Sequence, residues 1–378
     1  MKIILTGGGT GGHIYPALAL YSYLKEQYGT VAEFIYVGTS QGLEAEIVPK
    51  YGIQFVTIDS AGFSRKVSIK NIIALFKATN GLRQARSIIK SFKPDIVVGT
   101  GGFVCGPMVL MASLLRVPTL IHEQNALPGI TNKILAPFVN KICITFPEAA
   151  KHFSKASHKV EETGLPIRPQ ILTTNRNDAL LKLGLDKEKL TLLVVGGSRG
   201  AKSINAAMYH VISALKENNQ VQVLMITGKA GYNEFYKGLL EQGLTDEQMK
   251  NIIIKQYLDE MELGLAAADL VIARAGATFL AEITAMGIPS ILIPYPYASE
   301  NHQEHNAQSL VNTGGAIMIK DKELTGELLL KTIESLISNK PQLMQMGEKI
   351  KQLGKPEAIV KLANIIITEA KNSISNKF

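Results

Sequence analysis

The chain of 378 residues has no tryptophan and only two cysteines, Cys105 and Cys143. Neither cysteine has a CxxC or CxxH neighbour, which excludes a disulfide framework and a zinc ribbon and fits a reducing compartment. The apolar run MVLMASLL is far shorter than the roughly 18 residues of a membrane span. The N-terminal MKIILTGGG has too few apolar residues for a signal peptide. We therefore expect a protein that is neither secreted by that route nor integral to a membrane.

The composition excludes disordered, collagen-like and coiled-coil chains. Hydrophobic residues make up 46% and charged residues 19%, and 33 glycines outnumber 15 prolines. Such a chain buries sizeable cores. At roughly 150 residues per domain, its length predicts two domains.

Acidic residues are missing from one segment, residues 64–93. It holds eight basic residues, which account for the whole net charge of +8, because the rest of the chain has 32 basic and 32 acidic residues. One segment therefore carries the entire positive excess.

Short β-branched runs alternate with stretches of helical spacing, twice along the chain. The first set comprises KIILTGGG, EFIYVGT, QFVTI, DIVVGTGG, TLIHEQN and KICIT. The second comprises TLLVVGGSRG, QVLMITG, NIIIKQYL, ADLVIARAG, SILIPYP and AIMI. This alternation predicts an α/β fold of two doubly wound, Rossmann-like domains with parallel sheets. The Gly- and Pro-rich TGLPIRP marks the boundary, giving domains 1–164 and 165–346, and a C-terminal helix at about 347–378 could pack back on the first domain.

Glycine-rich turns follow several predicted strands. GGGTGGH (7–13) lies between a strand and a helix whose Pro16 suits a first turn, where backbone amides and the helix start can bind an anion. Similar glycines recur at 99–107, 196–200 and 274–278. They could simply make tight turns, but four loops at corresponding strand ends favour ligand sites, with two facing sheets enclosing a cleft. An NAD site is disfavoured, because the second strand ends in VGT without the acid that holds a ribose.

Several motifs occur together in a characteristic order. They are GGTGGH, HEQN followed by GITNK, GLPIR, GGSRGA, RAGATFLAE and HQEHNA. Their joint pattern, over residues 3 to about 310, strongly resembles the MurG family of bacterial N-acetylglucosaminyltransferases, which are GT-B enzymes of glycosyltransferase family 28. The resemblance implies that GlcNAc moves from UDP-GlcNAc to the C4 hydroxyl of MurNAc in undecaprenyl-pyrophosphoryl-MurNAc-pentapeptide (lipid I). The anomeric centre is inverted and lipid II of peptidoglycan is formed.

This chemistry needs a base for the acceptor hydroxyl, and His13 is the first candidate because a histidine titrates near neutral pH. His13 could instead only cap its loop. Glu123 is the rival base or an orienting partner. The glycine turns, through Gly8, Gly9, Gly101 and Gly102, are expected to hold the acceptor pyrophosphate.

The resemblance also implies a set of donor-binding residues. An arginine fork and a helix start would stabilise the leaving diphosphate, and a carboxylate at Glu282 would accept both ribose hydroxyls. Without its motif, Glu282 would be an ordinary helical ion pair, and Asn125 an Asx turn before Pro128. The predicted UDP-GlcNAc contacts are Thr10, Gly11, Gly12, Asn125, Arg168, Ser198, Leu258, Ala277, Thr278, Phe279, Leu280, Ala281, Glu282 and Gln303.

We predict no cofactor and no metal requirement. His302 and His305 have the spacing of a helical metal pair, but no other ligand motif accompanies them, so we interpret them as a loop histidine and a surface histidine.

The basic segment carries apolar residues at i, i+3, i+4 and i+7. Such a helix suits a membrane surface with anionic lipid, although the same spacing also fits a core-facing stripe. Nucleic-acid binding is disfavoured, because the segment has few aromatic residues and no known module. The predicted membrane-surface residues are Ile69, Lys70, Ile72, Ile73, Phe76 and Lys77.

The expected partners are UDP-GlcNAc, lipid I, an anionic membrane surface and other cell-wall synthesis proteins, with no nucleic acid. The expected location is the cytoplasmic face of the cell membrane, as a peripheral protein. Three alternatives stay open: another GT-B transferase with a lipid or antibiotic acceptor, a UDP-GlcNAc 2-epimerase, and a noncatalytic nucleotide-sugar or nucleic-acid binding module.

Overall fold

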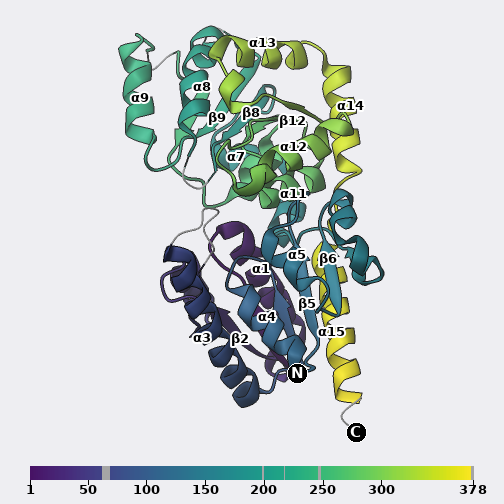
Figure 1. The fold of residues 1–378 in the computed structure, drawn as a ribbon. Helices are drawn as coiled ribbons and strands as arrows, with labels where there is room; N and C mark the ends of the chain where they lie inside the picture. Colours follow the sequence, from purple (N-terminus) through teal and green to yellow (C-terminus); the bar gives the residue numbers. More distant parts are fainter. Residues whose placement is uncertain (62–68, 198–199, 217, 246–247, 376–378) are drawn as a thin grey trace. The chain divides into compact units, whose positions relative to one another are not determined.

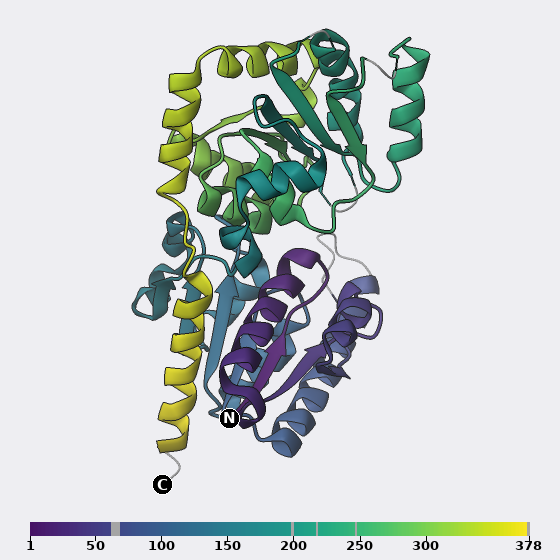
Figure 2. The ribbon, with the colours of Figure 1, turned by 180° about the vertical axis from the view of Figure 1, so that it is seen from behind.

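The computed structural model describes residues 1–61, 69–197, 200–216, 218–245 and 248–375, without the side chains of 69–76 and 373–375. The chain forms two compact units (Figures 1 and 2). The N-terminal unit comprises Met1–Ile167 and Pro356–Phe378, and the C-terminal unit comprises Arg168–Lys355. The chain first passes from the N-terminal to the C-terminal unit after Ile167, three residues after the predicted boundary. The returning segment begins at Pro356 and not at about 347, because residues 340–351 still form a helix of the C-terminal unit.

The N-terminal unit is built on a seven-stranded parallel sheet of order β3-β2-β1-β4-β5-β6-β7. Six of its strands are the predicted runs. The seventh, β7, was missed because its sequence VEE has no apolar run. The strands are β1 Lys2–Thr6, β2 Glu33–Gly38, β3 Gln54–Thr57, β4 Ile96–Gly99, β5 Thr119–Glu123, β6 Lys141–Ile144 and β7 Val160–Glu162.

Helices cover both faces of this sheet. Their bounds are α1 Gly11–Tyr28, α2 Leu43–Ile47, α3 Ile69–Phe92, α4 Cys105–Leu114, α5 Ile130–Leu135 and α15 Ala358–Ser375, with 3-10 helices η1 Gly29–Val31, η2 Val48–Tyr51 and η3 Pro147–Lys159. α1 begins at Gly11, more than a turn before the expected start near Pro16, so Pro16 lies inside the helix.

Alternate residues of β1 show how the two faces are filled. Ile3 and Leu5 pack with α1 and α15, whereas Ile4 packs with α3 and α4. This follows from the two-residue period of a strand. The C-terminal helix α15 thereby completes the core of the N-terminal unit, with Leu362 and Ile366 buried against the α1 side.

The C-terminal unit repeats the same strand order with six parallel strands, β10-β9-β8-β11-β12-β13. All six are predicted runs. The strands are β8 Leu190–Val195, β9 Val221–Ile226, β10 Ile252–Lys255, β11 Leu270–Ala273, β12 Ser290–Leu292 and β13 Ala316–Met318. The helices are α6 Pro169–Thr173, α7 Arg176–Leu183, α8 Lys202–Leu215, α9 Tyr232–Glu241, α10 Met261–Ala267, α11 Ala277–Met286, α12 His302–Asn312, α13 Gly326–Ile337 and α14 Lys340–Lys351, with η4 Ser299–Asn301 and η5 Asp321–Glu323.

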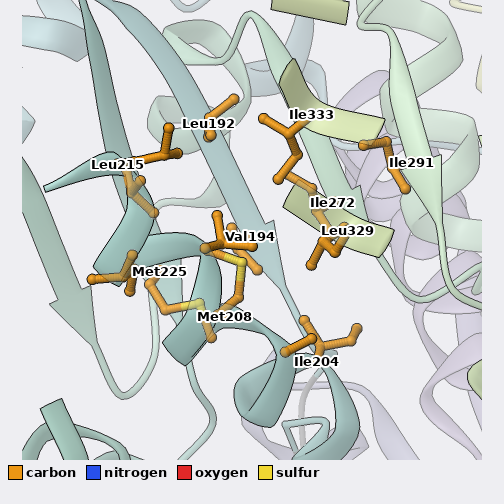
Figure 3. Packing of buried hydrophobic residues seen from close by; sticks show 14 of the residues in the cluster. Leu192, Val194, Ile204, Met208, Leu215, Met225, Ile272, Ile291, Leu329 and Ile333 are labelled. Atoms are coloured by element: carbon orange, nitrogen blue, oxygen red, sulfur yellow. The ribbon is translucent and has the colours of Figure 1, made fainter. Parts of the chain in front are cut away.

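One face of this sheet packs on α8 and α13 (Figure 3). Val194 and Ile272 of the central strands meet Met208 of α8 and Leu329 of α13 in a fully buried cluster. Each large buried side chain contributes about 1.5–3 kcal/mol. This core fixes the central strands, and therefore the positions of the turns that follow them.

Both sheets reverse their winding direction next to the first strand of the unit. In the N-terminal unit this switch point lies between β1 and β4, and in the C-terminal unit between β8 and β11. Ligands of open parallel sheets bind beyond the carboxyl ends of the strands at such points. The four glycine-containing turns singled out in the sequence follow these four strands.

Candidate active site

The turns after β1 and β4 touch each other through their backbones. The Gly8 N–H donates to the carbonyl of Gly101 over 3.2 Å. A methyl group added at Gly102 would lie 2.3 Å from the Gly8 oxygen, and Gly102 has a φ of +84°, which L side chains rarely adopt. No side chain fits at this crossing, so its glycines are a packing requirement.

His13 lies on the first turn of α1, beside this crossing. Its Nδ1 is 2.9 Å from the Gly8 carbonyl oxygen. Because a carbonyl only accepts, Nδ1 carries the proton, and Nε2 of the neutral ring keeps its lone pair. A methyl group at Gly101 would lie 3.0 Å from Nε2, so the absence of a side chain there leaves that nitrogen room. The loop contact thus orients the imidazole so that Nε2 is the ring nitrogen left to accept a proton.

Glu123 ends β5, where its side chain is buried and surrounded by donors. Oε1 accepts from the backbone N–H and side-chain amide of Asn125 at 3.0 and 3.2 Å. Oε2 accepts from the Gly129 N–H at 3.1 Å and the Asn132 amide at 2.8 Å. Four donors on one carboxylate favour the orienting interpretation of Glu123. The hydrogen bonds from Asn125 to Glu123 also fix the position of Asn125, which is a predicted UDP-GlcNAc contact.

His122, beside Glu123, is buried and neutral. Its Nε2–H donates to the Gly164 carbonyl at 2.9 Å, and Nδ1 accepts from the Gln124 amide at 3.1 Å. Burial lowers the pKa of His122, against the opposing effects of Gly164 and Glu123. This histidine therefore anchors the segment in which the chain leaves the N-terminal unit.

Most of the glycines predicted to hold pyrophosphate already use their N–H groups within the protein. Gly8 donates to Gly101, Gly9 donates to Glu44 at 3.0 Å, and Gly101 donates to the Cys105 sulfur at 3.2 Å. The backbone amides that begin α1, at Gly11 and Gly12, have no intrahelical acceptor, and such amides are the groups that bind anions. The structure thus places the anion-binding capacity of this turn at the helix start.

In the C-terminal unit, Arg168 and Glu282 form an ion pair. Arg168 Nη2 lies 3.3 Å from Glu282 Oε1, and its Nη1 lies 3.4 Å from Glu262 Oε2. Glu282 is buried on α11, and burial raises its pKa to about 6, although Arg168 opposes that rise and Glu262 adds to it. Two predicted donor contacts are therefore brought together as partners.

The predicted UDP-GlcNAc contacts at 277–282 form the start of α11, which follows β11 after a short turn. Gly276 is its extended N-cap, Ala277 and Leu280 are buried, and Thr278, Phe279 and Ala281 are partly exposed. Gln303 of α12 supports this turn, because its Oε1 accepts from the N–H groups of Ala275 and Tyr295 at 3.2 and 2.9 Å. These bonds fix the amide orientation, so that the NH₂ of Gln303 is the group left to donate.

The remaining residues singled out in the sequence are buried, exposed or outside the described ranges. The Leu258 side chain is buried. Ser198 lies outside the described residues. His302 Nδ1 contacts the Ser299 carbonyl at 2.6 Å, and His305 is exposed. Within the described ranges, no group of three or more His, Cys, Asp or Glu side chains could hold a metal ion.

Two site residues were missed by sequence reasoning. Glu44 is buried beneath the first glycine turn, with nothing in its local sequence to mark it. Arg274 lies in a recognised motif, but its partners are distant in sequence: Ser203 at 3.0 Å, the Ile293 carbonyl at 3.1 Å, and Asp321. It joins the starts of α8 and η5 to the turn after β11.

The basic segment, residues 64–93, includes the whole of α3. In its described half, Gly81, Ala85 and Ile89 are buried, whereas the basic side chains are exposed. The side chains of Ile69, Lys70, Ile72, Ile73 and Phe76 lie outside the described residues, although their backbone is helical as predicted. The exposed basic residues are Lys77, Arg83, Arg86, Lys90 and Lys93.

Among the helices that the structure describes, none is both long and apolar enough to cross a membrane.

Known proteins match both units. Residues 3–144 match the Glycosyltransferase family 28 N-terminal domain, and residues 191–362 match the Glycosyltransferase family 28 C-terminal domain. A relative from Halothermothrix orenii is 52% identical over 374 residues, covering 99% of this chain and 100% of the relative. Another from Desulforamulus reducens is 50% identical over 359 residues, covering 95% and 96%.

Both relatives are named UDP-N-acetylglucosamine-N-acetylmuramyl-(pentapeptide) pyrophosphoryl-undecaprenol N-acetylglucosamine transferase. The crystal structure of Acinetobacter baumannii MurG superposes with a TM-score of 0.77 at 27% identity, covering 97% of this chain and 99% of that one.

The raised pKa of Glu282 generates a prediction about stability. The native pKa of about 6 lies above the ordinary 4.5, so ionising Glu282 costs more free energy in the folded unit than in the unfolded chain. This costs roughly 2 kcal/mol above pH 6, and the cost disappears as the pH falls below 4.5. We expect Glu282→Gln to stabilise the C-terminal unit by up to this amount at pH 8, with the gain shrinking towards pH 5.

Hydrogen exchange of the β8 and β11 amides in rising urea measures this gain for the C-terminal unit. The exposed Glu241, changed to Gln, is the matched control. A Glu282→Gln protein that is less stable than the wild type at pH 8 would contradict the expectation.

Proposed function

Since the chain belongs to glycosyltransferase family 28, we infer that it is a hexosyltransferase with the activity of its relatives. It transfers GlcNAc from UDP-GlcNAc to lipid I and so forms lipid II in peptidoglycan synthesis. The observation that carries this conclusion is identity at about half of all positions, over nearly the full length of two transferases of that name. The finer chemistry, attack by the C4 hydroxyl of MurNAc with inversion at the anomeric carbon, is proposed together with it.

The N-terminal unit supplies the base. His13 Nε2 takes the proton of the acceptor hydroxyl as its oxygen bonds to the anomeric carbon of GlcNAc. The geometry around Nδ1 supports this role, because the Gly8 carbonyl stabilises the imidazolium that results. The amides that begin α1 then bind either the acceptor pyrophosphate or the donor. Thr10, Gly11 and Gly12 were predicted as contacts of the donor, UDP-GlcNAc.

The C-terminal unit holds the nucleotide. Glu282 accepts hydrogen bonds from the ribose hydroxyls, and Arg168 pairs with the diphosphate. Both contacts require the ion pair between these side chains to open. The distance of 3.3 Å between Arg168 and Glu282, and of 3.4 Å between Arg168 and Glu262, supports such an exchange, because a diphosphate offers Arg168 shorter, bidentate bonds. The NH₂ of Gln303, fixed by two backbone bonds, donates to the GlcNAc hydroxyls.

The leaving UDP gains negative charge as the glycosidic bond breaks. A guanidinium and the start of α11 are the groups that stabilise it here, so we propose that transfer needs no metal ion.

We propose further that the enzyme works as a peripheral protein on the cytoplasmic face of the membrane. Its acceptor is anchored by undecaprenol, and residues 64–93 contain eight basic and no acidic residues. Exposed cations on α3, such as Lys77 and Arg83, support attraction to anionic lipid at about 1 kcal/mol each. Contacts with other cell-wall synthesis proteins belong to the same proposal.

Transfer itself is tested with radiolabelled UDP-GlcNAc and a short-chain lipid I analogue, reading the disaccharide and its linkage. We expect a β1,4-linked product, and a kcat reduced by about 10²-fold or more in His13→Ala, because a general base contributes that much. Exposed His158, changed to Ala, is the control. Product formed at the wild-type rate by His13→Ala would move the base elsewhere. Conversion of UDP-GlcNAc without acceptor would identify an epimerase, and saturable binding without turnover a noncatalytic module.

Metal independence is tested by assaying transfer after exhaustive treatment with EDTA. We expect the rate to stay within twofold of the untreated enzyme. A loss of activity that added Mg²⁺ or Mn²⁺ restores would contradict the proposal.

Membrane binding is tested by sedimentation with anionic vesicles. We expect the double change Ile72→Asp and Phe76→Asp to release the protein while UDP affinity is retained, because added charge repels anionic lipid and opposes apolar insertion. Leu181→Asp, at a residue 81% exposed in the C-terminal unit, is the control. Unchanged sedimentation of the double variant would refute the surface role of this segment.

A further inference from the structure

Glu44, the first acidic residue of α2, is completely buried and is used by no step described above. It forms no ion pair with a lysine, arginine or histidine of the described ranges. Its charge is compensated by hydrogen bonds from two loops. Oε2 accepts from the Gly9 N–H at 3.0 Å, and Oε1 accepts from the Thr39 N–H at 3.1 Å and the Thr39 hydroxyl at 2.7 Å. A buried carboxylate held in this way is costly to disturb.

Three glycines make room for this carboxylate. Methyl groups added at Gly8, Gly38 and Gly42 would lie 2.5, 2.6 and 2.2 Å from Glu44 atoms. The Glu44 side chain therefore fills the inner side of the turn after β1, where an anion lies in other glycine turns. The Gly9 N–H points inward to Glu44, so that the peptide before it, with the Gly8 carbonyl, is fixed in orientation.

That carbonyl is the group that accepts from His13 Nδ1. Glu44 thus acts on His13 through the Gly8–Gly9 peptide. Its hydrogen bond from the Gly9 N–H fixes the orientation of this peptide, and the Gly8 carbonyl oxygen then keeps the proton on Nδ1 of His13. Building on the proposed function, we propose that Glu44 is a positioning residue for transfer, which holds the glycine turn so that the lone pair of the His13 base stays on Nε2.

Glu44→Gln tests this with almost no change in shape. The carboxylate accepts on both sides, from Gly9 and from Thr39, whereas a carboxamide has a single accepting oxygen. The NH₂ side of the introduced carboxamide must then face an N–H donor, and the turn shifts. A displacement of this kind at a catalytic group costs about 10²-fold in rate.

The first readout is independent of transfer. In ¹⁵N-labelled full-length protein, the imidazole shifts of His13, assigned with His13→Gln, report which ring nitrogen carries the proton. We expect the Nδ1–H form in the wild type and a mixture of forms in Glu44→Gln. The second readout is kinetic: kcat falls by about 10- to 100-fold and the acidic limb of its pH profile, where the base becomes protonated, moves in pH, while KM for UDP-GlcNAc stays within twofold.

Glu46→Gln is the matched control, because it makes the same change at an exposed position of α2. A folded Glu44→Gln protein that keeps the wild-type His13 form and the wild-type kcat overturns the proposal. If this variant does not fold, Thr39→Val, which removes a single donor to Glu44, decides by the same two readouts. If the wild type itself transfers nothing to the lipid I analogue, the proposed function fails, and the ¹⁵N measurement alone decides the role of Glu44.

Discussion

The N-terminal site depends on the close approach of two turns, those after β1 and β4. Their backbones touch at Gly8, Gly101 and Gly102, where no side chain fits. This contact places the Gly8 carbonyl beside His13 and leaves Nε2 open. Its geometry derives from the order of strands, because β1 and β4 are adjacent in the sheet and so deliver their turns to the same edge.

The two units stabilise buried charge in different ways. In the N-terminal unit, Glu44 and Glu123 accept hydrogen bonds from backbone, amide and hydroxyl donors, which connect the loops after β1, β2 and β5. In the C-terminal unit, Arg274 and Arg168 pair with carboxylates. The first arrangement ties loops to one another, since most of its donors are backbone N–H groups. The second leaves a guanidinium that can exchange an internal partner for a phosphate.

Sequence patterns predicted the strands well, because buried parallel strands are continuous β-branched runs. They failed for β7, whose residues are mostly acidic, and for the start of α1, where glycines conceal the helical pattern. The glycine turns and His13 could be located from motif order. Their hydrogen bonds could not, since partners such as Glu44 and Gly9, or Arg274 and Asp321, are joined only by folding. Burial of Glu282, which sets its pKa, likewise depends on packing that no local pattern records.

The interrupted makeup of the N-terminal unit has a consequence for its biogenesis. Residues 356–378 belong to it, yet a ribosome at about 5–20 residues per second adds the intervening 188 residues in roughly 10–40 s. Throughout that interval the nascent sheet presents the apolar surface that α15 later covers, including Ile3 and Leu5. The N-terminal unit can therefore complete its core only after α15 has been synthesised. A translation product truncated before α15 exposes an apolar surface that chaperones and proteases can bind.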